Sequence, residues 1–506
     1  MSLPLSPAYD LVVVGSGPTG STYVREVFEQ HPGARILVVE AGPRISDPPG
    51  GHVKNIADDE RRAQAQRASE GPSPASPGRP GTRLLAAPDM PAAAVSTNVG
   101  GMGAHWTAAC PRPGDGERIP FIPAAEMDQH LARAEQLLHV SADAFDDAPF
   151  ADEVRHRLAR HFDDGRPASR RVAPMPLAVT TRPDGSRTWS GTDVVLGSAA
   201  RDSRVELADR CLCLRVRYEG GVVTGVVVRD LSDGGAGQET EIAASAVVVA
   251  ADALRTPQLL HASGIRPAAL GRYLNDQPQV VFAVRLPDDV VATHDAVTDR
   301  TRDEDGGIVP QSGVSWVPYT DDQPFHGQVM QLDASPVPLA DTTPVQPGSI
   351  VGLGWFCAKD VTSEDRITFA DDTNDAFGMP TATIHYRYTD RDLATIEAAK
   401  RAVTEAGTAL GAPLDPAPFL LPAGSSLHYQ GTTRMGPTDG DTSVCDTFSR
   451  VWNTVGLWVA GNNVIPTATA CNPTLTSVAL ASRGARSLVE HLLRRETAAT
   501  VPPSRT

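Results

Sequence analysis

The chain has 506 residues, of which 41% are hydrophobic and 21% are charged, the composition of a soluble globular protein. This length is more than one hydrophobic core commonly serves, so two domains or one large α/β unit with insertions are expected. The formal net charge of −16 disfavours nucleic acid and anionic membrane as partners, because both attract a basic surface.

The N-terminal segment and the cysteines indicate the compartment in which the protein works. Residues 1–10 lack the basic and apolar segments of a signal peptide, and no apolar run approaches the roughly 18 residues that span a bilayer. We therefore expect a cytoplasmic protein. The six cysteines show no disulfide framework, and Cys211-Leu-Cys213 has no second pair at zinc-binding spacing. They are expected to be small buried residues in a reducing compartment, and no metal site is expected.

Residues 9–40 are predicted to form a strand, a helix and a second strand. Tyr9–Val14 is almost uniformly apolar, as expected of a buried parallel strand. Pro18 suits the first turn of a helix that ends at Pro32-Gly33, and Arg35–Glu40 is the second strand. The segment is therefore interpreted as a βαβ unit.

Three glycines between the first strand and the helix have the spacing of a dinucleotide-binding loop. Gly15 allows a tight turn, Gly17 lets the backbone approach a pyrophosphate, and Gly20 lets the helix pack on the strand. The N–H groups and dipole of the helix N-terminus favour phosphates. Glu40 closes the second strand, about 20 residues further on, where a carboxylate accepts hydrogen bonds from ribose hydroxyls. The pattern predicts a bound dinucleotide but does not distinguish FAD from NAD.

Residues 57–95 differ in composition from their surroundings. A charged stretch from Asp58 to Glu70 is followed by Gly71–Gly81, which is rich in proline and glycine. This second part cannot bury apolar surface and is expected to be mobile. The insertion is either a linker or a lid over an active site, since long loops in enzymes are often gates.

Further elements follow along the chain. Helices are predicted at Ala124–Leu138, Asp152–Phe162 and Asp390–Leu410, and strands between residues 205 and 249 and again over 280–415. The last strand of the first group is predicted to lead through Thr256-Pro257 into another helix.

This layout indicates an α/β protein in which a β-rich second domain interrupts a Rossmann-like nucleotide-binding domain. We assign residues 1–112, 191–278 and 415–506 to the nucleotide-binding domain. Residues 113–190 and 279–414 are assigned to the second, substrate-binding domain.

Two blocks near the C-terminus carry a candidate catalytic pair. His428 begins the run His428–Gly436, and Asn472 lies in Ala470–Thr476. A histidine and an asparagine brought together can take a proton from a hydroxyl and hold its oxygen in place. The alternative for His428 is a hydrogen-bonded core histidine. For Asn472 it is a turn residue before proline, which is compatible with catalysis.

The segment Asn98–Thr107 combines several glycines with a histidine, a tryptophan and a threonine hydroxyl. From Gly100 to Thr107 it resembles the flavin loop of the pyranose 2-oxidase family, in the glucose–methanol–choline (GMC) oxidoreductase superfamily. His428 and Asn472 match the catalytic pair of that family. The resemblance covers about half the chain, and its blocks occur in the family's order.

The resemblance implies FAD as the cofactor and a set of residues that contact it. These are Gly15, Gly17, Thr19, Gly20, Glu40, Gly101, Met102, His105, Thr107, Cys213, Gly461, Asn462 and Thr474. In fungal members the histidine at the place of His105 is covalently bonded to the flavin, whereas some bacterial relatives hold FAD noncovalently. The resemblance leaves open which applies here.

The resemblance also implies oxidation of a secondary ring hydroxyl of glucose or a glycoside to a keto-sugar. The chain length and the 57–95 insertion are more similar to bacterial glycoside 3-oxidases, which also act on C-glycosides, so C3 is favoured over C2. Oxygen or another acceptor would reoxidise the flavin.

In the mechanism we hypothesise, neutral His428 takes the hydroxyl proton as hydride leaves for flavin N5, and Asn472 hydrogen-bonds the same oxygen. Gln328 and Asp333 are candidates for binding sugar hydroxyls, or are polar residues of an exposed strand.

Two other functions stay open at this point. One is a different GMC alcohol oxidase or dehydrogenase that acts on an aliphatic or steroid alcohol. The other is a noncatalytic scaffold with a nucleotide-binding fold, such as a binder resembling GDP-dissociation inhibitors. The oligomeric state is not predicted.

Overall fold

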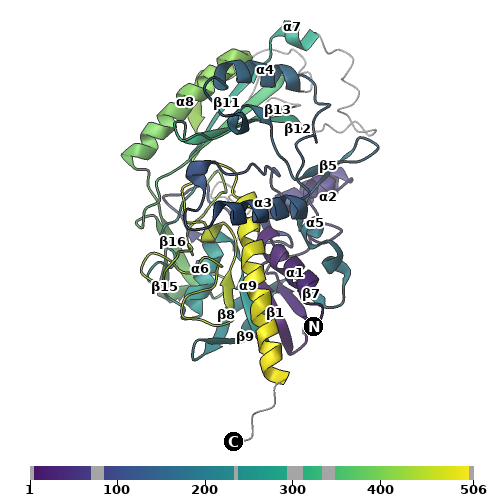
Figure 1. Cartoon of the computed structure of the whole chain (residues 1–506), viewed down its shortest axis with the longest axis vertical. Coiled ribbons are helices and arrows are strands. Elements are labelled where there is room, and N and C mark those ends of the chain that lie inside the picture. The colour runs from purple at the N-terminus through teal and green to yellow at the C-terminus, as the bar shows by residue number, and fades with distance from the viewer. Residues whose placement is uncertain (1–4, 70–84, 233–236, 293–310, 333–347, 501–506) are drawn as a thin grey trace, which may run out of the picture.

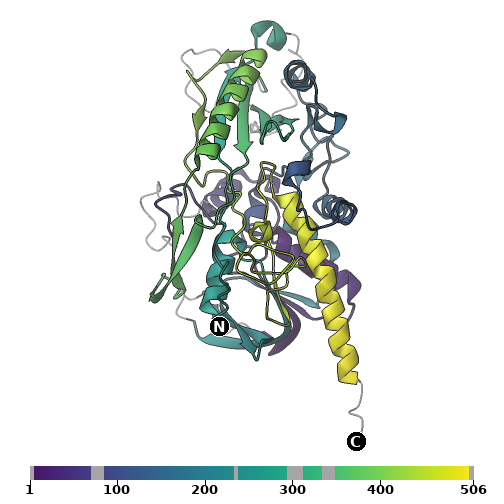
Figure 2. The ribbon, with the colours of Figure 1, turned by 60° about the vertical axis from the view of Figure 1, so that its left-hand side comes forward.

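The computed structural model describes residues 5–69, 85–232, 237–292, 311–332 and 348–500 (Figure 1). Two large sheets lie at opposite ends of the long axis, with the first and last segments of the chain in the same half (Figures 1 and 2). The structure confirms the α/β class.

The first sheet has the order β7-β2-β1-β10-β9-β8, and β19 also pairs with β10. Its core strands β1, β2, β7, β10 and β19 run parallel, whereas β9 and β8 form an antiparallel extension. The bounds of its strands are β1 Ala8–Val14, β2 Ile36–Val39, β7 Val205–Ala208, β8 Cys211–Glu219, β9 Val222–Asp230, β10 Glu239–Val249 and β19 Leu457–Val459. The predicted βαβ unit is therefore confirmed.

Helices α1 (Pro18–Gln30), α3 (Ala124–Leu138) and α9 (Thr474–Thr500) pack together beside this sheet (Figure 1). The inward sides of α1 and α9 bury Tyr23 and Leu488 against strand residues such as Val13. The C-terminal helix thus returns to the sheet that the N-terminus begins.

Helix α6 (Asp252–Ala262) corrects one prediction about the chain after β10. It starts directly after the strand, and Pro257 lies inside it rather than before it. A proline removes the N–H that would bond the carbonyl four residues earlier. Here the Thr432 hydroxyl donates to that carbonyl, of Ala253, at 2.5 Å, so a distant side chain replaces the missing bond.

All strand pairs of the second sheet are antiparallel. Its order is β17-β11-β14-β13-β12-β4, with β18 also pairing with β11. Helices α4 (Ala151–Phe162) and α8 (Asp390–Leu410) pack on one face of it (Figure 1). The bounds of its strands are β4 Ala173–Pro174, β11 Gln279–Arg285, β12 Gln311–Val317, β13 Phe325–Leu332, β14 Ile350–Cys357, β17 Ala412–Pro413 and β18 Phe419–Leu420.

Smaller elements complete the described structure. A three-stranded sheet joins β15, β16 and β3, and β5 pairs with β6. The remaining bounds are β3 Leu85–Ala86, β5 Val179–Thr181, β6 Arg187–Trp189, β15 Arg366–Asn374, β16 Pro380–His385, α2 Asp59–Ser69, α5 Thr192–Leu196 and α7 Asp288–Val291.

Two sequence-based assignments stay predictions. The first is the set of domain boundaries. Residues 113–190 were assigned to the second domain, but α3 packs on α9 beside the first sheet, whereas α4 packs on α8 beside the second. The lid is the other: α2 accounts for the charged part of the 57–95 insertion, and residues 70–84 lie outside the described residues.

Candidate active site

A cavity of about 400 Å³ opens at the carboxyl ends of β1, β2 and β10. All of the cofactor-contacting residues predicted from the sequence line it except Gly20, and so do His428 and Asn472. The fold therefore brings the N-terminal glycine loop, the loop at 100–107 and the two C-terminal blocks together around one cavity.

The glycine loop after β1 has the geometry that its sequence predicts. Gly15 has a φ of +104°, and a Cβ there would lie 2.2 Å from the Ala250 carbonyl oxygen. Gly20 does not line the cavity, but a Cβ there would lie 2.1 Å from the Gly15 carbonyl oxygen, so it serves the predicted packing of helix on strand. Nothing lies within 4 Å of a Cβ at Gly17, the N-cap residue just before α1. The backbone at Gly17 is thus open to a ligand.

Glu40 lines the cavity and also holds the loop around it. Its Oε2 accepts hydrogen bonds from the Ser16 hydroxyl (2.7 Å) and backbone N–H (3.2 Å), and its Oε1 accepts from the Gly42 N–H (2.9 Å). The Ser16 hydroxyl oxygen in turn accepts from the Gly100 N–H at 2.9 Å. Burial raises the pKa of Glu40, and these hydrogen bonds counteract the rise. Glu40 therefore connects the first glycine loop to the second.

The second glycine loop, Gly100–Thr107, is held by its neighbours on both sides. The Trp106 indole N–H donates to the Ser190 carbonyl at 3.0 Å, and the Trp106 carbonyl lies 2.9 Å from His52 Nε2. His105 Nε2 lies 3.2 Å from Asn98 Oδ1, while its Nδ1 has no partner among the described residues. Burial lowers the pKa of His105 to about 4, so the ring is neutral near pH 7.

His428 and Asn472 form a pair on the cavity wall. The Asn472 Nδ2 lies 3.4 Å from His428 Nε2, and Asn472 Oδ1 has no partner among the described residues. The opposite ring nitrogen, Nδ1, lies 2.7 Å from Gln277 Oε1, and the ring packs at a tilt against Phe356 with centroids 5.2 Å apart. Burial lowers the pKa of His428 to about 3. The imidazole is therefore neutral and able to accept a proton.

The two sugar-binding candidates have different outcomes. Gln328 lies on β13 and is 4% exposed, so the alternative of an exposed strand does not apply to it. It does not line the cavity, and its role stays a prediction. Asp333 lies outside the described residues.

No site residue was predicted in one wall of the cavity, which is formed by α6 and the turn between β15 and β16. Residues from these elements that line the cavity are Asp252, Ala253, Arg255, Gln258, Leu259, Asp375, Phe377 and Met379. Arg255 pairs with Asp375 at 3.4 Å, and Arg229 donates to the Phe377 carbonyl at 2.9 Å. The turn comes more than a hundred positions after α6, and no local pattern in the sequence indicates that the two meet.

The cysteines of this protein are single thiols. All six cysteines are free and buried, and Cys211 and Cys213 line the cavity. In this part of the chain no three His, Cys, Asp or Glu side chains gather as metal ligands. None of the described helices combines the length and the apolar character needed to cross a membrane.

Two models of one family, described as GMC oxidoreductase, match residues 118–279 and 362–481. Among curated proteins, the C-glycoside 3-oxidase of Arthrobacter globiformis is 56% identical, over 96% of each chain. The C-glycoside 3-oxidase of Microbacterium trichothecenolyticum is 53% identical, over 97% of this chain and 99% of its own. The pyranose 2-oxidase of Tricholoma matsutake is 32% identical, over 96% and 94%.

Solved structures show the same fold at low sequence identity. Pyridoxine 4-oxidase from Mesorbium loti superposes with a TM-score of 0.63 at 18% identity, covering 96% of this chain and 99% of that one. A formate oxidase of Aspergillus oryzae RIB40 superposes with a TM-score of 0.64 at 15% identity, covering 97% and 99%.

Proposed function

Because the chain belongs to the GMC oxidoreductase family, we propose that it is an FAD-dependent enzyme that oxidises the C3 hydroxyl of a glycoside to a ketone. C-glycosides and glucose are included among its substrates. The observation that carries this proposal is the placement of His428 and Asn472, 3.4 Å apart, on the wall of the cavity that the dinucleotide loop also lines.

The cavity fits FAD in the features that a dinucleotide requires. The open backbone at Gly17 and the start of α1 suit a pyrophosphate, and Glu40, which lines the cavity, would accept hydrogen bonds from ribose hydroxyls. Gly101, Met102, His105, Thr107, Gly461, Asn462 and Thr474 also line the cavity and would contact the cofactor. When bound, FAD supplies the electron sink that accepts hydride from the substrate carbon.

His428 acts as the base in this proposal. A secondary alcohol has a weakly acidic O–H, so a group must take its proton as the C–H bond breaks. Burial keeps His428 neutral, its Nε2 lies beside Asn472, and both residues line the cavity. A positioned base of this kind typically contributes about 10²–10⁴-fold to the rate.

Asn472 holds the oxygen from which His428 takes the proton. The 3.4 Å between Asn472 Nδ2 and His428 Nε2 is longer than an ordinary hydrogen bond, so the amide N–H is able to turn to a substrate oxygen. This N–H would donate to the oxygen as negative charge develops on it. Asn472 precedes Pro473, so the turn-forming role considered for it is compatible with this one.

The choice of C3 over C2 rests on the relatives. The two C-glycoside 3-oxidases are 56% and 53% identical to this chain, against 32% for the pyranose 2-oxidase of Tricholoma matsutake. A noncatalytic scaffold would give no role to the pair of His428 and Asn472, and no observation favours it.

The test is anaerobic reduction of the bound flavin by a panel of substrates. The panel contains glucose, an O-glycoside, a C-glycoside, an aliphatic alcohol and a steroid alcohol, and NMR identifies the oxidised carbon of each product. We expect bleaching of the flavin absorbance by sugars with a 3-keto product. A 2-keto product would assign C2, and bleaching by the aliphatic or steroid alcohol alone would overturn the proposal.

A further inference from the structure

We propose that Gln277 is a positioning residue that fixes His428 as the Nδ1–H tautomer, so that the bare Nε2 faces the substrate hydroxyl. This inference deepens the proposed function and rests on it for its catalytic meaning. Gln277 is 1% exposed and does not line the cavity, so it acts only through His428.

The orientation of the Gln277 amide follows from its other partners. Its Nε2 donates to the Cys471 carbonyl at 2.9 Å and to the Thr469 hydroxyl oxygen at 3.1 Å. A carbonyl oxygen only accepts, so the NH₂ group has to lie on that side of the amide. The amide oxygen, Oε1, is therefore the atom that faces His428.

The tautomer of His428 follows in turn. Gln277 Oε1 lies 2.7 Å from His428 Nδ1, and because this oxygen cannot donate, Nδ1 has to carry the proton. A neutral imidazole has one N–H, so Nε2 is left with its lone pair. The hydrogen bond made by one ring nitrogen thus decides the state of the other.

The segment that carries Gln277 also holds the backbone of His428. The Asp276 carboxylate accepts hydrogen bonds from the Gly424 N–H (3.1 Å), the His428 N–H (3.3 Å) and the Ser426 hydroxyl. Two consecutive residues therefore hold the main chain and the ring of His428.

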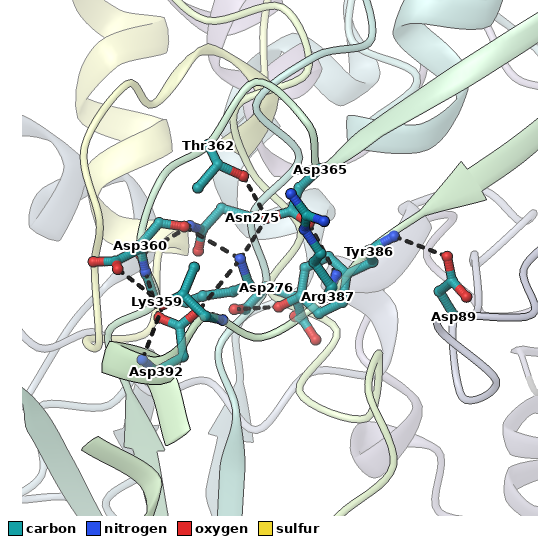
Figure 3. Close-up of polar contacts among 11 residues, drawn as sticks. Asp89, Asn275, Asp276, Lys359, Asp360, Thr362, Asp365, Tyr386, Arg387 and Asp392 are labelled. Atoms are coloured by element: carbon teal, nitrogen blue, oxygen red, sulfur yellow. Dashed lines mark hydrogen bonds and ion pairs between the residues drawn. The ribbon is translucent and has the colours of Figure 1, made fainter. Parts of the chain in front are cut away.

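A buried charged cluster and its neighbours also hold residues 275 and 276 (Figure 3). Lys359 is fully buried, and its ammonium pairs with Asp365 at 2.5 Å and lies 3.7 Å from Asp392. The Lys359 carbonyl accepts from the Asn275 side-chain amide at 3.0 Å. The Tyr386 hydroxyl donates to the Asp276 carbonyl at 3.0 Å. Residues 275 and 276, just before Gln277, are thus anchored to the chain directly after β16 and to the chain after β14.

The direct test is ¹⁵N NMR of ring-labelled histidine, which separates protonated from bare ring nitrogens and does not depend on activity. His428 is assigned by loss of its signals in His428→Gln. In the wild type we expect Nδ1 to be protonated and Nε2 to be bare. In Gln277→Leu, which removes the acceptor, we expect a mixture of both tautomers. An Nε2–H tautomer in the wild type, or an unchanged tautomer in Gln277→Leu, would overturn the proposal.

Gln430→Leu is the matched control. Gln430 is also fully buried and donates to the same Thr469 hydroxyl, at 2.7 Å, but it makes no hydrogen bond to the His428 ring. We expect its His428 to keep the wild-type tautomer. Equal tautomer mixtures in the two variants would show a general loss of packing and would contradict a specific role for Gln277.

Kinetics give a second measurement. We expect Gln277→Leu to slow flavin reduction by a sugar at least about 10-fold, with little change in KM or FAD content, because the base as a whole contributes about 10²–10⁴-fold. If the tautomer shifts but no sugar reduces the wild-type flavin, the proposed function fails while this inference stands. If sugars reduce the wild-type flavin and the tautomer does not shift, only this inference fails.

Discussion

Asn472 Nδ2 lies 3.4 Å from His428 Nε2, although the two residues come from separate turns, one after β18 and one before α9. The neighbours of the ring are uncharged: Gln277 at Nδ1, Asn472 at Nε2 and Phe356 on one face. None of these three side chains carries a charge that would offset the burial, which keeps the imidazole neutral.

The first prediction concerns the pH dependence of the reaction. Burial lowers the pKa of His428 to about 3, and the base is active in its neutral form, which predominates above that pKa. We expect the rate of flavin reduction at saturating sugar to stay level from pH 7.5 down to pH 5, measured by rapid mixing. A fall centred near pH 6.5, the ordinary value for histidine, would contradict this account.

His326 gives a prediction about stability. It is fully buried, neither ring nitrogen has a partner among the described residues, and burial lowers its pKa to about 3. Below pH 6.5 the unfolded chain binds a proton here that the folded protein does not, so folding loses about 1.4 kcal/mol per pH unit from this residue.

The variant His326→Phe removes this loss and keeps the stacking on Phe356, whose ring centroid is 5.3 Å away. We expect its advantage in free energy of unfolding over the wild type to grow between pH 6.5 and pH 4, measured by urea denaturation. A difference that stays constant over this range would show that His326 is protonated in the folded protein.

Lys359 gives a prediction about the buried cluster in Figure 3. Lys359→Met leaves the Asp365 and Asp392 carboxylates buried without their cation. Breaking a buried pair in this way costs about 3–5 kcal/mol, measurable as a lower denaturation midpoint. Lys400→Met is the control, because Lys400 is partly exposed and pairs with Glu397 on the surface of α8, so its loss should cost less than about 1 kcal/mol. Equal losses of stability in the two variants would contradict a special contribution of the buried Lys359.

The burial of the cysteines leads to a prediction about the reactivity of their thiols. All six are buried and free, and burial raises the pKa of those that line the cavity, to about 12 for Cys211. Because the thiolate is the reactive form, we expect no thiol to react with a disulfide reagent in the native protein and six to react in denaturant. Rapid reaction of one native thiol would place a cysteine at the surface.

Local sequence patterns were enough to predict helices and turns whose structure depends mainly on residues close in the sequence. Helices α3 and α8 have the predicted bounds, and the glycine loop of Gly15 and Gly20 has the predicted geometry. The prediction failed at Pro257, because the hydroxyl that compensates for it belongs to Thr432, far away in the sequence.

The same distinction applies to the site. His428 and Asn472 could be named from their own blocks, since each lies in a recognisable run. Gln277 and Asp375 could not, because their roles come from contacts with residues more than a hundred positions away. Side chains that act through such contacts leave no periodic or local signal.

The most direct test of the central claim compares anaerobic flavin reduction in the wild type, His428→Ala and Asn472→Ala with the best C-glycoside of the panel. All three proteins should hold the same amount of FAD, measured by absorbance. We expect His428→Ala to be slower than the wild type by about 10²–10⁴-fold, and Asn472→Ala by about 10²-fold or more. Near wild-type rates of flavin reduction in both variants would contradict the assignment of base and oxygen anchor.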